Sequence, residues 1–161
     1  MMRMTSLEPR SLAGARRQRG LAMVEFAIGA PLLLLLLLGI GEFGRLLSQY
    51  NQLLQGSRDA ARYVASHAMN ATLGQIQLTT ALQDTAKNLL VYSSPTVGST
   101  PIVPGLGAGQ VQVSAVDSEH IQVSVTYSFQ PVVGNVLLPG IFGKGAALNI
   151  PLTATTVMRA L

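Results

Sequence analysis

The most apolar part of the chain is residues 21–41. It contains seven consecutive leucines, Leu32–Leu38, and its only ionisable residue is Glu25. At about 1.5 Å per residue, a helix over this stretch is roughly 31 Å long, which matches the hydrocarbon core of a bilayer. We therefore predict that residues 21–41 form a transmembrane helix.

Residues 42–70 keep the helical spacing of apolar positions but carry polar residues, Arg45 and Gln49 among them, on the wetter sides. The apolar positions recur at steps of three and four, with Ser57 in one slot: Phe43, Leu47, Tyr50, Leu54, Ala61, Val64 and Ala68. No proline occurs in this stretch, so the helix is expected to continue as an amphipathic segment over 42–70. Gly44, Gly56 and Ala60 are small enough for another backbone to come close, which suits lateral helix packing.

Residues 71–161 predict a mixed domain. A second helix is expected over 71–91, and a loop rich in Pro and Gly over 93–109. The apolar period then changes to two, which indicates strands at 111–115 and 121–129.

The predicted sheet consists of a hairpin and a third strand. The polar cluster at 117–120 separates the first two strands as an antiparallel hairpin, and a third strand fits residues 148–158. Pro151 places that third strand at an edge or a bulge. Residues 130–146 are apolar for a connection and are expected to form a buried helical turn or a contact surface. The fold class is α+β: a long N-terminal helix, a second helix and a small antiparallel sheet of about three strands.

The basic character of the chain lies in its first twenty residues. The whole sequence has a net charge of +4, and residues 1–20 hold five Arg against one Glu, while the remainder holds six residues of each sign. By the positive-inside rule, the basic leader 1–20 stays in the cytoplasm and residues 71–161 lie across the membrane. The neutral remainder lacks the basic patch and aromatic platforms of a nucleic-acid-binding protein.

Gly20 stands at the junction between the leader and the apolar segment. A protease that cuts after Gly20 would make Leu21 the new N-terminus and Glu25 the fifth residue. The new α-ammonium group could then pair with Glu25 of a neighbouring subunit, because a carboxylate in an apolar setting gains from a positive partner. Alternatively, the Glu25 side chain reaches the lipid headgroups without such a partner.

The residues from this junction onwards resemble a known family. Four segments carry the resemblance: the stretch from Arg19 to Ala27, the segment beginning at Pro31, the sequence Gly39-Ile-Gly-Glu-Phe-Gly-Arg45 and the sequence Ala60-Ala-Arg-Tyr-Val-Ala65. Together they look like the TadE-like minor pseudopilins of bacterial tight-adherence (Tad) pili. The similarity covers residues 17–66, about a third of the chain. The major Tad pilins have Glu-Tyr where this chain has Glu25-Phe26, which favours a minor pseudopilin.

This resemblance implies a type IV-like prepilin, cut after Gly20 by an aspartyl prepilin peptidase. It implies a precursor in the bacterial inner membrane with a periplasmic 71–161 domain. The implied partners are the prepilin peptidase and other Tad pilins and pseudopilins, which it would join in pilus assembly.

Other interpretations of the N-terminus remain. The strongest is an uncleaved single-span anchor that carries a periplasmic binding module. A Sec signal peptide could be cut after Gly41, which ends in small residues. Arg16-Arg17 suggests a twin-arginine signal, but the following apolar segment is too hydrophobic for one.

Catalytic chemistry finds little support in the sequence. The absence of cysteine excludes disulfides, thiolate metal sites and a cysteine nucleophile. Asp117, Glu119 and His120 are expected to form a turn rather than a metal or acid–base site, and no hydrolase or nucleotide-binding motif occurs. We therefore expect no enzyme activity, no cofactor, no metal and no small-molecule substrate.

Overall fold

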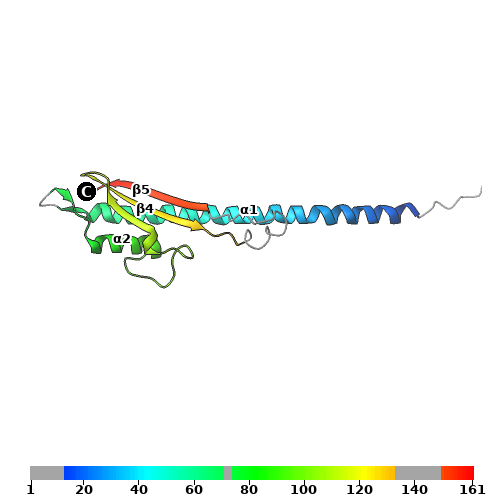
Figure 1. Ribbon diagram of the computed structural model, residues 1–161, viewed down its shortest axis with the longest axis horizontal. Helices are drawn as coiled ribbons and strands as arrows, with labels where there is room; N and C mark the ends of the chain where they lie inside the picture. Colours follow the sequence, from blue (N-terminus) through cyan, green and yellow to red (C-terminus); the bar gives the residue numbers. More distant parts are fainter. Residues whose placement is uncertain (1–12, 71–73, 133–149) are drawn as a thin grey trace, which may run out of the picture. The chain divides into compact units, whose positions relative to one another are not determined.

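The structure is a computed structural model that describes residues 13–70, 74–132 and 150–161, with side chains described from residue 20 onwards. Its elements in chain order are α1 (Ala13–His67), β1 (Met69–Asn70), β2 (Gln75–Ile76), α2 (Thr80–Tyr92), the 3-10 turn η1 (Ala108–Gln110), β3 (Val111–Ala115), β4 (His120–Phe129) and β5 (Ile150–Arg159) (Figure 1). The predicted α+β fold is confirmed. The chain divides into two compact units, Met1–Gly41 and Glu42–Leu161.

In the first unit, α1 is apolar and exposed. The most apolar window of its described residues has a mean hydropathy of 2.4, and none of that window is buried. By length and composition, this helix can cross a membrane, as predicted. The helix continues through Pro31, and it begins at Ala13, within the basic leader.

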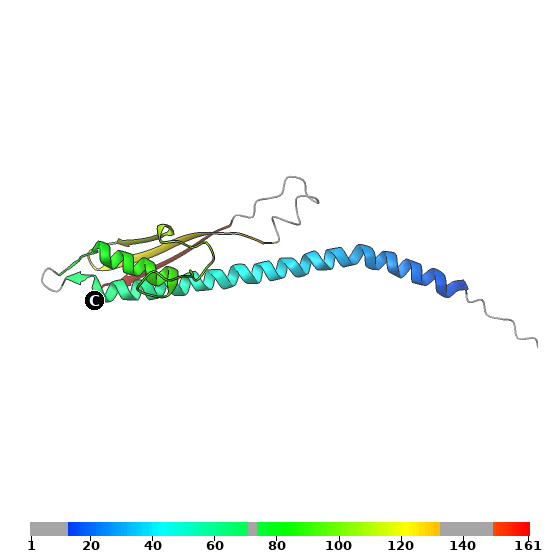
Figure 2. The same cartoon turned by 90° about the horizontal axis from the view of Figure 1, so that it is seen from below.

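In the second unit, residues 42–67 of α1 pack against the rest of the domain (Figure 1 and Figure 2). The α1 residues in the core are mostly small: Leu53, Ala60, Ala61, Val64 and Ala65. Ser57, the one polar position in the predicted stripe, is fully buried. Its hydroxyl donates to the Leu54 carbonyl at 2.9 Å and accepts from Thr156 at 2.9 Å, so its burial leaves no hydrogen bond unmade.

The predicted stripe is wrong at its beginning. Phe43 and Leu47 are exposed, at 60% and 44%, whereas Gln49, expected on a wet side, is 9% exposed. The buried side of α1 is therefore rotated near Glu42 relative to the predicted stripe. The reason is the chain after β4, which covers the side of α1 that carries Glu42 and Arg45.

The three-stranded sheet has the order β3-β4-β5, with both pairings antiparallel. Val123 of β4 pairs with Val113 of β3, and Val125 pairs with Ala154 of β5. Alternate residues of β4 are buried, from Ile121 to Phe129, because successive side chains of a strand point to opposite faces. The hairpin and the third strand are confirmed, and β5 lies at an edge of this sheet, as Pro151 predicted.

The predicted second helix begins too early. The first helix also ends at His67, short of the predicted 42–70, and residues 69–70 and 75–76 pair as a two-stranded antiparallel ribbon. Helix α2 begins at Thr80 because the Thr79 side chain caps it, accepting a hydrogen bond from the Leu82 N–H at 3.3 Å. It ends at Ser93, whose backbone is left-handed with a φ of 53°.

The apolar connection at 130–146 lies outside the described residues from 133 onwards. Of the described part, Pro131 is buried and Val132 is exposed. Ile150 begins β5 and is 41% exposed, whereas Leu152 and Ala154 face the core.

Gly56 and Gly44 give a matched test of the helix packing. A Cβ atom at Gly56 would lie 3.0 Å from the Leu90 carbonyl oxygen, whereas one at Gly44 would meet nothing within 4 Å. We expect Gly56→Leu to lower the free energy of unfolding by about 1–3 kcal/mol through overpacking. Gly44→Leu should leave it unchanged or raise it by up to about 1 kcal/mol, because leucine has the higher helix propensity. Denaturant unfolding followed by circular dichroism measures both, and equal effects would contradict the close approach of α1 and α2.

Candidate functional site

The predicted processing junction lies within helix α1. Gly20 and Leu21 are exposed, and a Cβ atom at Gly20 would meet nothing within 4 Å. The backbone at this position is helical. A protease that needs an extended substrate would have to unwind α1 here, and glycine lowers the cost of doing so by about 1 kcal/mol relative to alanine.

Glu25 is surrounded along α1 by exposed apolar residues, including Leu21 and Phe26, which are 72% and 74% exposed. Within the described residues, its carboxylate has no hydrogen bond and no ion pair. An unpaired carboxylate costs about 2.5–3.5 kcal/mol at the centre of a bilayer and less towards the interface. The residue therefore carries a charge that the described part of the chain does not compensate.

A second group of residues lies where the second unit begins. We call it the exit cluster: Glu42, Arg45, Phe129, Gln130 and Val132. The Glu42 carboxylate accepts from the Val132 N–H at 2.8 Å and forms an ion pair with Arg45 at 3.3 Å. The other terminal nitrogen of Arg45 donates to the Gln130 carbonyl at 2.8 Å. The Arg45 guanidinium also lies 5.3 Å from the centre of the Phe129 ring, within the range of a cation–π contact.

The exit cluster fastens the chain after β4 to α1. Hydrogen bonds that involve a charged group are stronger than neutral ones, and the Glu42 side chain is only 17% exposed. Glu42 and Arg45 lie three residues apart, so they share one side of the helix. Together they hold the backbone at two points, Gln130 and Val132.

Sequence reasoning missed this role for Glu42 and Arg45. Both residues belong to the motif that carries the family resemblance, but Arg45 was expected only on a wet side of the helix. The signal that could have found their ion pair is the spacing of three, because residues three apart on a helix are neighbours. The contact with residues 130–132 had no signal, because it joins positions about 90 residues apart and depends on the end of β4.

The residues expected in lateral helix packing have different surroundings. Gly56 and Ala60 are buried within the second unit, and Gly56 lies against Leu90 of α2. Gly44 is exposed and open. A role in packing between subunits therefore stays a prediction, and Gly44 is the position that the fold leaves accessible for it.

The acidic and histidine cluster forms a turn between β3 and β4. One carboxylate oxygen of Asp117 accepts from the N–H groups of Glu119 and His120 at 2.8 and 2.7 Å. The pKa of the Asp117 carboxyl lies below its ordinary value, first because of the hydrogen bond from the Glu119 N–H and then because of the one with the His120 side chain. Glu119 pairs instead with Arg159 at 3.0 Å. Within the described residues, no group of three or more potential ligands could hold a metal ion.

A known protein family matches part of the chain. Residues 20–62 match the family model described as TadE-like protein. The match begins at Gly20 and includes Glu25, Glu42 and Arg45, so the resemblance is confirmed over this segment and is consistent with a TadE-like Tad pilus protein. No curated protein and no solved structure matches the chain.

The match covers about a quarter of the chain, and the apolar helix adds a second indication of the class of protein. They indicate a membrane-associated protein connected with Tad pili. TadE-like pilus proteins are structural rather than enzymatic. Among the described residues, one helix is long and apolar enough to cross a membrane, and its place near the N-terminus fits a membrane anchor.

Arg45→Ala tests whether the exit cluster stabilises the domain. The substitution removes the bond to Gln130 and the partner of Glu42, so we expect the free energy of unfolding to fall by about 1–2 kcal/mol. Arg58 is exposed on the same helix and has no ion pair or hydrogen bond within the described residues, so Arg58→Ala is the matched control. Chemical denaturation of both variants in detergent provides the comparison. Equal stability of the two variants would show that the exit cluster contributes nothing.

The Asp117 turn predicts a pH dependence. Because the pKa of Asp117 is lowered in the folded state, its charge stabilises the fold above the ordinary value of 3.8, and this contribution is lost as the pH falls through the folded value. Asp117→Asn should therefore be less stable than the parent protein near pH 6, and the difference should shrink towards pH 3. Asp59→Asn, at an exposed position on α1, is the control and should follow the parent protein. If the stability difference between Asp117→Asn and the parent protein stayed constant with pH, the lowered pKa of Asp117 would be contradicted.

Proposed function

We propose that this protein is a minor pseudopilin that takes part in the assembly of Tad (type IV-like) pili. The observation that carries the proposal is the TadE-like match, which begins at Gly20 and extends through the apolar helix to Arg62. In this proposal, residues 1–20 are a cytoplasmic leader, residues 21–41 span the inner membrane and residues 42–67 continue the helix. The 71–161 domain is periplasmic.

In this proposal, a prepilin peptidase cuts between Gly20 and Leu21. The exposure of Gly20 and the open space around it support access by a protease. Cleavage removes a leader with a net charge of +4 and leaves a neutral protein. It also creates a new α-ammonium group four residues before Glu25.

Glu25 would then pair with the α-ammonium group of another subunit, a Tad pilin or pseudopilin. The unpaired carboxylate supports this role, because it lies on an apolar helix that offers it no partner within the described residues. Pairing across subunits would offset the cost of placing two charges in an apolar assembly. It would also favour subunits that have been processed.

A second candidate is an uncleaved anchor that carries a periplasmic binding module. The specific observation in its favour is that α1 begins at Ala13 and runs without a break through Gly20. An anchor that keeps its leader would have such a continuous helix across the Gly20–Leu21 junction. The two candidates differ in the fate of the Gly20–Leu21 bond.

Gly20 variants test the processing step. When the chain is produced together with a prepilin peptidase in membranes, we expect the parent protein to lose its leader and Gly20→Val to keep it, because a branched side chain obstructs the cut. Gly29→Val, within the same helix, is the control and should still be processed. Gel mobility and intact mass report the leader. Full processing of Gly20→Val would exclude Gly20 as the cleavage site.

Glu25→Gln tests the pairing role. The variant keeps the size of the side chain and removes its charge, so we expect normal cleavage but a large loss of assembled pili in a host that depends on this subunit. Met23→Leu changes an exposed apolar residue of the same helix and should leave assembly intact. Electron microscopy and recovery of sheared pili measure assembly. Normal pili with Glu25→Gln would rule out the pairing.

A further inference from the structure

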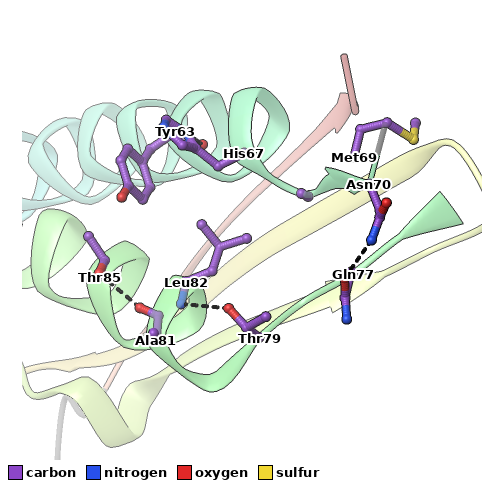
Figure 3. A pocket seen from close by; sticks show the side chains of 10 residues that line it. Tyr63, His67, Met69, Asn70, Gln77, Thr79, Ala81, Leu82 and Thr85 are labelled. Atoms are coloured by element: carbon purple, nitrogen blue, oxygen red, sulfur yellow. Dashed lines mark hydrogen bonds between the residues drawn. The ribbon is translucent and has the colours of Figure 1, made fainter. Parts of the chain in front are cut away.

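A cavity of about 540 Å³ lies where α1 ends, between α1, β1 and the beginning of α2 (Figure 3). Its volume falls within the range of small-molecule sites. No Lys, Arg, Asp or Glu is among the described residues that line it. The cavity therefore offers polar groups to a ligand without the charge that would attract an ion.

Two threonines of the lining provide complementary hydrogen-bonding groups. The Thr79 hydroxyl oxygen accepts from the Leu82 N–H, so its proton is available to donate to a ligand. The Thr85 hydroxyl donates to the Ala81 carbonyl at 2.8 Å, so its lone pairs are available to accept. Figure 3 shows both bonds on the α2 side of the cavity.

His67 supplies a further acceptor from α1. Its Nδ1 atom lies 2.9 Å from the Tyr63 carbonyl oxygen, which can only accept, so the tautomer that makes this bond carries its proton on Nδ1. In the neutral ring, the Nε2 atom then has a free lone pair. The Ser66 hydroxyl lies 2.9 Å from the same Nδ1 and donates to the Tyr63 carbonyl, which is consistent with this tautomer.

Aromatic and aliphatic groups complete the lining. The Tyr63 and His67 rings stack with their centres 4.5 Å apart and an angle of 27° between their planes. Figure 3 shows the Tyr63 ring projecting from α1 towards Thr85, with Leu82 between the two helices. A stacked pair of rings is a stiff, flat surface at low cost in side-chain entropy.

We propose that this cavity binds a neutral saccharide. Each hydroxyl of a sugar both donates and accepts, which matches a lining that supplies donors and acceptors side by side. The C–H face of a pyranose ring can pack on the Tyr63–His67 pair and on Leu82. The absence of Lys and Arg from the described lining disfavours acidic sugars and phosphorylated ligands. This binding role is separate from pilus assembly and does not depend on cleavage at Gly20.

The test uses the full chain in a zwitterionic detergent without a sugar headgroup, lauryldimethylamine oxide. Saturation-transfer difference NMR with lactose, cellobiose and N,N′-diacetylchitobiose, each at about 10 mM, should detect at least one ligand with millimolar affinity. An acetylated and amidated neutral tetrapeptide and 3′-sialyllactose serve as comparison probes and should bind more weakly or not at all. Absence of signal for all three neutral disaccharides, or preferential binding of the peptide, would overturn the proposal.

Two variants locate the binding. Thr85→Val keeps the shape of the side chain and removes its hydroxyl, and His67→Phe keeps a ring and removes Nε2. Each should weaken binding by about 3- to 10-fold, as expected for the loss of one hydrogen bond. Thr155→Val makes the same chemical change on the exposed face of β5 and should leave the affinity unchanged. Thermal unfolding confirms that the variants fold. Unchanged affinity in both folded cavity variants would also overturn the proposal.

Discussion

The close approach of α1 to α2 is the constraint on which the second unit depends. Gly56 brings the α1 backbone close to the Leu90 carbonyl, and Ala60 and Ala61 are fully buried beside it. Larger side chains there would force the helices apart and open voids between them, at a cost of several kcal/mol. The inward face of β4 completes this core. The small residues in this part of α1 are therefore used for packing within the chain.

The first unit has the opposite property. From Leu21 onwards its residues are apolar apart from Glu25, and none in the most apolar window is buried, so this part of α1 needs a partner that the described chain does not provide. A bilayer satisfies the apolar residues, but it does not satisfy Glu25. A protein that only needed an anchor would gain nothing from a carboxylate in this helix. In the proposed function, the charge acts when the leader is removed and subunits associate.

Much of the fold could be predicted because its signals are local. The leucines at 32–38 and the continued helical spacing beyond Gly41 indicated one long helix, and alternation from Ile121 to Phe129 indicated β4. The start of α2 was missed because residues 74–79 have no strong helix-breaking signal other than Gly74, whose φ is 61°. The capping role of Thr79 depends on a single side-chain bond, and threonine within a helix looks the same in the sequence.

Only some of the candidate functional residues could be predicted from the sequence. Glu25 and Gly20 stood out because a lone carboxylate and a charge boundary interrupt an otherwise uniform segment. The exit cluster and the cavity near His67 did not, because each joins residues that are distant in the chain. The Tyr63–His67 stack follows from a spacing of four on a helix, but its exposure to a cavity depends on where α2 begins.

The central claim is that the working protein begins at Leu21. The most direct test is N-terminal sequencing of the protein purified from the membranes of a cell that contains its prepilin peptidase. The account predicts a sequence that begins Leu-Ala-Met-Val-Glu, with Glu25 as the fifth residue. A sequence that begins at Met1 would contradict it and support an uncleaved anchor, and one that begins at Glu42 would indicate a cleaved signal peptide instead.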